Sequence, residues 1–264
     1  MLTAVKGNLK LMFLGIKYNT MKCMENKVAF ATSVIMMIFN NASFIIQWIT
    51  IFAIKDTVGG YTLNDVMLFW AISSGAYGLA HIFFNGVNKI PEYIEEGKLD
   101  AFLTTPKNPL CYVITSSTAP SAWGDLIYGY IALIIFNFSI KNIILYTILI
   151  IFGSLIYAST ICIFNTLTFV FYKSSEVTNV VSSALLNSSL YPDVIFSRAV
   201  KIIFFTIVPS GFACWIPVHL IISFNPIYLF ILIIATISYI SLAFILFDKG
   251  LKHYSSSNLM GARS

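Results

Sequence analysis

The segment Lys89–Pro109, KIPEYIEEGKLDAFLTTPKNP, is densely charged and lies between two long apolar blocks of the chain. Apolar residues recur at helical spacing on either side of Gly97, which predicts two short amphipathic turns, begun by Pro91 and stopped by Pro106. So short and charged a segment can neither span a bilayer nor be buried in one. Two interpretations follow, a surface for a soluble partner or an ordinary solvated loop. The charged residues are Glu92, Glu95, Glu96, Asp100, Lys89, Lys98 and Lys107.

The composition indicates a membrane protein with little chain left for soluble domains. Of the 264 residues, 58% are hydrophobic and 10% are charged, whereas a soluble domain carries about 25% charged residues. We therefore expect a single all-α integral membrane domain over residues 1–264. The net charge of +5 is then the loop bias of membrane proteins and not a sign of nucleic-acid binding.

The cysteines and the N-terminal segment show no processing or metal signature. The four cysteines are isolated, with no Cys-x-x-Cys or Cys/His ligand spacing, so we expect neither disulfides nor zinc. They are interpreted as small buried hydrophobes. About the first 25 residues contain lysines throughout and lack the uninterrupted apolar core of a cleavable signal peptide.

The first part of the chain predicts an interfacial helix followed by two spans. Residues 1–27 place five lysines among apolar residues, as in a basic amphipathic helix that lies in the headgroup layer on the cytosolic side. Residues 28–87 hold the first two spans, Val28–Ile54 and Leu63–Val87. The second span carries small residues, which let helix backbones approach closely, at Ser73, Ser74, Gly75 and Gly78.

The later spans give an even count. After the loop at 88–109, residues 110–172 hold spans three and four, Leu110–Ile140 and Ile143–Tyr172. The last span, Pro226–Phe247, falls in residues 225–248 and precedes a polar tail at 249–264. Twelve of the sixteen Lys and Arg residues then lie on the inner side, which predicts six spans with both termini in the cytosol.

Residues 173–224 admit two paths. In the first, Glu176–Tyr191 is a rather polar fifth span and residues 194–222 are re-entrant helices on the outer side. In the second, Glu176–Ser197 lies along the inner surface and Ala199–Ser223 is the span, which the charges of Arg198 and Lys201 favour. Both paths require broken backbone that is buried in protein or lines a water-filled cavity.

Three polar residues are candidates for a role inside the membrane. Asp125 lies within the third predicted span, where an acid is a functional-site hypothesis; alternatively it makes a helix–helix hydrogen bond or lies near the interface. His81 is interpreted as a packing or interface residue. Glu176 lies just inside the membrane boundary, where it would pair with Lys173 or with a neighbouring protein. His219 has no evident ligand partners.

Motifs of catalysis are missing from the sequence. It contains no HExxH, no GxSxG and no GxxxxGK[ST] P-loop, since Gly97-Lys98 is followed by Leu99. We therefore expect no catalytic residue, no metal site and no cofactor in this chain.

With these residues in view, the chain resembles the permease subunit of type-2 ABC (ABC-2) exporters, in the bacterial branch with a "G.LD.LL..P.NPL … GD" loop. The matching residues are Ile94, Gly97, Leu99, Asp100, Leu103, Pro106, Asn108, Pro109 and Leu110, then Gly124, Asp125 and Gly129. Later matches are Tyr191-Pro192, Ile195-Phe196, Pro209, Pro217 and Gly250–Ser255. The resemblance covers essentially the whole chain.

The resemblance implies an architecture and a set of partners. Residues 1–27 become an interfacial elbow helix, residues 90–105 a coupling helix that docks on a separately encoded P-loop ATPase, and the region after the fifth span external re-entrant helices. Two permeases, identical or related, would work with two ATPases, which bind the ATP and Mg, in the plasma (inner) membrane. The implied docking residues are Pro91, Glu92, Ile94, Glu95, Glu96, Gly97, Leu99, Asp100, Leu103 and Pro106.

Two other classes of function remain open from the sequence. One is an ion-coupled secondary transporter or channel that uses Asp125 and His81; the other is a membrane scaffold or immunity protein without transport. The Phe-, Ile- and Tyr-rich spans suit lipophilic drugs, peptides or lipids equally as substrates.

Overall fold

The computed structural model describes residues 2–105, 108–171 and 174–254. Across these residues the secondary structure is helical and contains no β-strand, apart from one isolated bridge between Val58 and Tyr61. The expected all-α class is therefore confirmed.

Four helices of the described chain are long and apolar enough to cross a membrane. They are α2 (Lys27–Phe52), α3 (Leu63–Phe83), α8 (Ile140–Asn165, extended by the 3-10 turn η2, Thr166–Phe169) and α12 (Pro226–Leu251). A bent pair of helices brings the count to as many as five. These agree with the first, second, fourth and last predicted spans.

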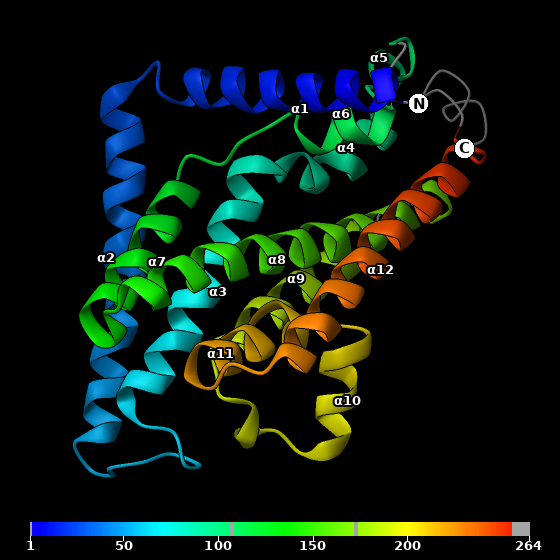
Figure 1. Ribbon diagram of the computed structural model, residues 1–264. Coiled ribbons are helices and arrows are strands. Elements are labelled where there is room, and N and C mark those ends of the chain that lie inside the picture. The colour runs from blue at the N-terminus through cyan, green and yellow to red at the C-terminus, as the bar shows by residue number, and fades with distance from the viewer. Residues whose placement is uncertain (1, 106–107, 172–173, 255–264) are drawn as a thin grey trace.

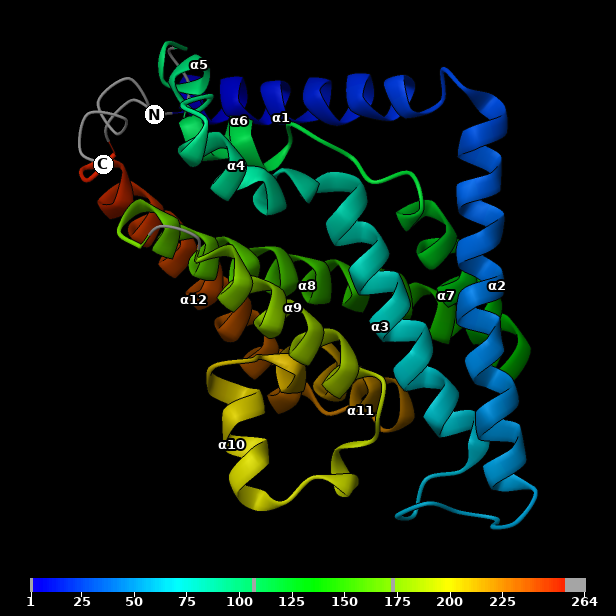
Figure 2. The ribbon, with the colours of Figure 1, turned by 180° about the vertical axis from the view of Figure 1, so that it is seen from behind.

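Different elements gather at the two opposite ends of the folded molecule (Figures 1 and 2). Helix α1 (Leu2–Cys23) lies across one end, crosswise to α2, and Asn26 caps α2 by accepting a hydrogen bond from the Ala29 N–H. The end of α12 lies at the α1 end, as does the segment that leads from α3 to α6 (Pro109–Ile114). The connection between α2 and α3 lies at the opposite end, near α10 (Arg198–Thr206).

Helix α3 is the centre of the fold and packs against α7 (Ala122–Asn137) and α8. A Cβ at Gly78 would lie 2.7 Å from the Leu126 nitrogen, so only glycine lets α3 and α7 approach this closely. Gly75 and Gly129 similarly face the Tyr146 hydroxyl, which donates to the carbonyl of Ala71. The small residues predicted to bring backbones together in the second span do so here.

The third predicted span, Leu110–Ile140, is wrong as a continuous helix. The structure has α6, a non-helical segment at 115–121 and then α7. This segment is held by the end of α3, because the Thr118 hydroxyl and the Ala119 N–H donate to the carbonyls of Ile82 and His81. Pro120 lacks the N–H that a helix needs at its position.

Residues 174–224 contain α9 (Ser175–Ser189), a turn η3 (Asp193–Ile195) and α10, followed by the π-helical turn η4 (Gly211–Trp215) and α11 (Ile216–Ile222). The axis bends by 85° between α10 and residues 211–222. A single straight span over Ala199–Ser223 is therefore ruled out, and Pro209 explains the break because it cannot donate a helical hydrogen bond. The fifth predicted span, Glu176–Tyr191, corresponds to the 15-residue helix α9.

Candidate functional site

The charged segment forms a helical hairpin at the α1 end of the molecule. The turn η1 (Asn85–Lys89) leads from α3 into α4 (Ile90–Glu95), which is followed by α5 (Asp100–Leu103); we call α4 and α5 together the hairpin. Pro91 lies in the first turn of α4. Gly97 has φ of 69°, in the left-handed region that favours glycine, and lies between the two helices. The structure thus has two short helices around Gly97, as predicted, while Pro106 lies outside the described residues.

The apolar side of the hairpin anchors it to the body of the protein. Ile90, Ile94 and Leu99 are at most 1% exposed. The Leu99 N–H donates to the Tyr93 carbonyl at 2.9 Å, and the Tyr93 and Ser116 hydroxyls are 3.0 Å apart. Three of the residues implied to dock an ATPase are therefore buried in this conformation, and they support the outer surface of the hairpin from beneath. They are Pro91, Ile94 and Leu99.

The outer side of the hairpin carries a cluster of opposite charges. Lys89 and Lys98 each place Nζ 3.1 Å from a carboxylate oxygen of Glu92, and Lys98 also pairs with Glu96. Hydrogen bonds from Lys89 and then Lys98 lower the pKa of Glu92 below its ordinary value. Such solvent-exposed pairs add little stability, so the cluster remains available for other contacts.

The accessible docking candidates are fewer than the sequence implies. Glu96 is exposed, Leu103 is 39% exposed, and Glu92, Glu95 and Asp100 are partly exposed. An exposed leucine beside carboxylates and a lysine suits contact with a polar protein groove.

Asp125 joins three helices. It lies in the first turn of α7, is 5% exposed, and its Oδ1 accepts a hydrogen bond of 2.6 Å from the side-chain amide of Asn41 on α2. The Ser74 hydroxyl of α3 donates to the Asp125 backbone carbonyl at 2.7 Å. The positive end of the α7 dipole also favours an acid here. This geometry matches the helix–helix hydrogen bond that the sequence left as one interpretation of Asp125.

The other two candidate intramembrane residues lie apart from Asp125. The His81 ring stacks on Tyr77 with centroids 3.9 Å apart, and His81 Nδ1 lies 3.0 Å from the Tyr77 carbonyl oxygen, as expected of a packing residue. Glu176 is exposed in the first turn of α9, and its suggested partner Lys173 lies outside the described residues. Within the described chain, no hydrogen bond or ion pair joins the three into one site.

At the end of the molecule opposite α1, the structure contains a polar cluster that the sequence did not predict. Asp193 accepts hydrogen bonds from the Tyr61 hydroxyl at 2.8 Å and from Lys201 Nζ at 2.7 Å, and its Oδ1 lies 3.6 Å from His219 Nε2. His219 thus has a carboxylate neighbour that the sequence did not indicate, although no group of three or more His, Cys, Asp or Glu side chains is arranged around it to hold a metal ion in the described residues. The only local sequence signal for this cluster was the spacing of Asp193 and Lys201, because Tyr61 and His219 are distant from them in sequence.

The electrostatics of this cluster favour an ionised Asp193. Burial raises the pKa of Asp193, but the neighbouring His219 and the hydrogen bonds from Lys201 and Tyr61 outweigh burial and hold this pKa well below its ordinary value. Burial, and then the hydrogen bond to Asp193, raises the pKa of Tyr61. The cluster therefore connects the α2–α3 loop, η3, α10 and α11 at one point.

Across residues 2–105, 108–171 and 174–254, no group of three or more His, Cys, Asp or Glu side chains is arranged to hold a metal ion. A family model described as ABC-2 family transporter protein matches residues 34–258 of the chain. No curated protein and no solved structure gives a significant match.

Proposed function

The chain belongs to the ABC-2 transporter family, as a membrane-spanning permease, and we propose that it serves an ATP-driven exporter whose ATPase is a separate chain. The main support for this proposal is the structure of the hairpin. The hairpin is anchored by buried apolar side chains and presents Glu96, Lys98 and Leu103 outward. The ATP and Mg would be bound by two copies of the ATPase.

Movement of the hairpin would reach the spans through direct connections. Helix α4 follows η1 and α3 with almost no intervening chain. The buried side chain of Asn165, at the end of α8, donates to the Val87 carbonyl in η1 at 2.6 Å. A partner that binds the hairpin differently in its two nucleotide states would therefore bias the arrangement of α3 and α8.

The proposed membrane arrangement follows from the two ends of the molecule. Helix α1 would lie in the inner headgroup layer as the elbow helix, with the hairpin and both termini on the cytosolic side of the plasma membrane. Helices α2, α3, α7, α8, α9 and α12 would make six crossings. The bent pair of α10 with residues 211–222 would then be re-entrant on the outer side, supported by its position at the end opposite α1 (Figure 2).

A second permease is supported by the surface of α2. This helix carries exposed polar side chains at heptad-like spacing, a set we call the α2 polar stripe: Asn40, Ser43, Gln47 and Thr50. Such side chains are unfavourable against lipid, whereas amides and hydroxyls form hydrogen bonds between packed membrane helices. The proposed partner on this stripe is a second permease, identical or related.

The docking assignment is tested by co-purifying the permease with candidate P-loop ATPases. We expect the double variant Glu96→Lys, Leu103→Asp to lose bound ATPase and transport-linked hydrolysis, while Lys141→Glu, an exposed change in the first turn of α8, keeps both. Full retention of ATPase by the double variant would show that the hairpin is not the docking element. If no candidate ATPase binds either the wild-type permease or the Lys141→Glu control, the exporter proposal is wrong.

A further inference from the structure

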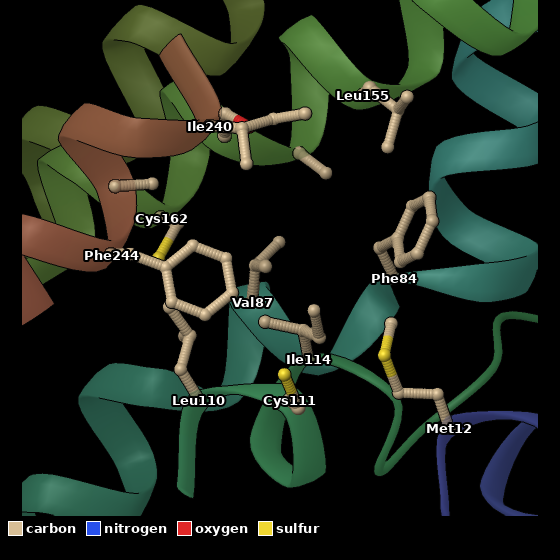
Figure 3. A pocket seen from close by; sticks show the side chains of 13 residues that line it. Met12, Phe84, Val87, Leu110, Cys111, Ile114, Leu155, Cys162, Ile240 and Phe244 are labelled. Atoms are coloured by element: carbon tan, nitrogen blue, oxygen red, sulfur yellow. The ribbon is translucent and has the colours of Figure 1, made fainter. Parts of the chain in front are cut away.

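Two neighbouring apolar cavities lie along α8. The first, about 190 Å³, is lined by side chains from η1, α1, α6, α8 and α12, which converge around it in Figure 3. The second, about 330 Å³, lies between α3, α7 and α8. Both are lined in part by Phe84 and Leu155, so these two side chains stand between the cavities. We call the pair the α8 groove.

The groove is larger than the voids of a packed interior. Protein cores leave few spaces larger than a water molecule, and an engineered apolar cavity of roughly 150 Å³ is sufficient to bind benzene. The residues around the first cavity are nevertheless well buried by the rest of the chain, as Val87, Cys162 and Ala243 are at most 4% exposed. The side chains that line the groove therefore lack van der Waals partners on the side facing it, and an apolar ligand would supply them.

The lining of the groove selects a ligand without polar groups. The hydroxyls of Thr147 and Ser154, in the second cavity, already donate to the carbonyls of Ile143 and Ile151. The first cavity is lined by apolar side chains except for Ser159. A polar molecule would lose its hydrogen bonds to water on entry, whereas a hydrocarbon chain would not.

The groove is long enough to hold one acyl chain. Its lining runs along α8 from Thr147 to Cys162, which at about 1.5 Å per residue is about 22 Å. This length exceeds the roughly 15 Å that is half the thickness of the hydrocarbon core, so the groove has room along α8 for one acyl chain. Ile151, 48% exposed, lies at the rim of the second cavity and leaves it open to the surroundings.

Helix α1, which closes one end of the groove, carries positive charge on its outer face. Met12 of α1 lines the first cavity, and exposed lysines lie on the same helix at Lys6, Lys10 and Lys17. Basic amphipathic helices attract anionic lipid headgroups. We propose that the α8 groove binds one acyl chain of an anionic membrane lipid, whose headgroup lies beside α1. This inference rests on the membrane location of the chain and is independent of the ATPase.

The test uses the full-length permease in vesicles that contain phosphatidylglycerol with a photoreactive diazirine in its acyl chain. After illumination, the adducts are mapped by mass spectrometry. We expect them on the peptides of α6 and on residues 155–162 of α8, and fewer from phosphatidylcholine that carries the same group. Adducts spread as densely over the exposed face of α2 would overturn the site. Equal adducts from phosphatidylcholine would overturn the headgroup contact.

A cavity-filling variant supplies the matched control. Ala243→Leu places three more carbons in the groove and should reduce these adducts about tenfold, because at least two methylene contacts are displaced. Ser241→Leu makes an exposed leucine two residues away on α12 and should leave the adducts unchanged. Unchanged labelling of a folded Ala243→Leu protein would refute the inference, as would cross-links between groove peptides of two copies. If Ala243→Leu does not fold, Ala158→Leu is used in its place. If neither variant folds, the distribution of adducts on the wild-type protein tests the inference.

Discussion

The side-chain amide of Asn165 donates a hydrogen bond of 2.6 Å to the backbone carbonyl of Val87, and Asn165 is 2% exposed. This bond fastens the end of α8 to the turn that leads into the hairpin. This bond links two residues that are 78 positions apart in the sequence, at the place where an ATPase is proposed to act.

Replacing Asn165 should weaken this connection. We expect Asn165→Leu to lower the free energy of unfolding by about 1–3 kcal/mol, because the buried Val87 carbonyl loses its donor. We also expect fewer substrate molecules exported per ATP hydrolysed, with the ATPase still bound. The measurements are thermal unfolding in detergent and the ratio of transport to hydrolysis in vesicles. A normal ratio in a stable variant would show that this bond does not transmit movement.

Gly97 should tolerate no ordinary side chain. Its φ of 69° disfavours Ala by about 1 kcal/mol or more, so Gly97→Ala should distort the hairpin and reduce ATPase binding. Asn tolerates this conformation better, and Gly97→Asn is expected to retain more binding. The comparison is made by titrating ATPase onto the immobilised permease. Equal binding by both variants would contradict a role for this turn in docking.

Asp125 is expected to act by joining helices and not by carrying a proton. Asp125→Asn can still bond to Asn41 and should keep most transport. Asp125→Leu and Asn41→Leu should each cost about 1–3 kcal/mol of unfolding free energy, and the double variant less than their sum. Unfolding of the four proteins measures this coupling. Loss of transport in a stable Asp125→Asn protein would instead favour ion coupling.

The Asp193 cluster should make stability depend on acid pH. The folded-state pKa of Asp193 lies below its ordinary value, so its stabilising contribution is complete above the unfolded pKa of about 3.9 and is lost as the pH falls below that value. Asp193→Asn should therefore unfold at a lower temperature than wild type at pH 7, and the difference should shrink below about pH 4. A difference that stays constant over this pH range would contradict an ionised Asp193.

The α2 polar stripe should lie between two permeases. We expect Gln47→Cys to form a disulfide-linked dimer in oxidised membranes, whereas Ile245→Cys, exposed on α12, should not. The readout is the dimer fraction on non-reducing gels, in a background that lacks the four native cysteines. Equal cross-linking at the two positions would indicate random collision and would remove support for this interface.

Much of the fold was predictable because its signals are local. Apolar runs of sufficient length predict α2, α3, α8 and α12, and Pro91 and Gly97 predict the two turns of the hairpin. The membrane class follows from composition alone. These features depend on neighbouring residues and on the bilayer as a solvent, so they need no tertiary contact.

Only the tertiary structure decided the remaining features. After α6 the third span breaks where Thr118 and Ala119 donate hydrogen bonds to α3, and no local pattern reveals which residues of α3 accept them. Burial of Ile94 and Leu99 separates the anchors of the hairpin from its exposed residues. Asp193 meets Tyr61 across 132 positions of sequence. Hydrophobic periodicity specifies which helices form, whereas side-chain hydrogen bonds between distant segments decide where those helices stop and which polar residues meet.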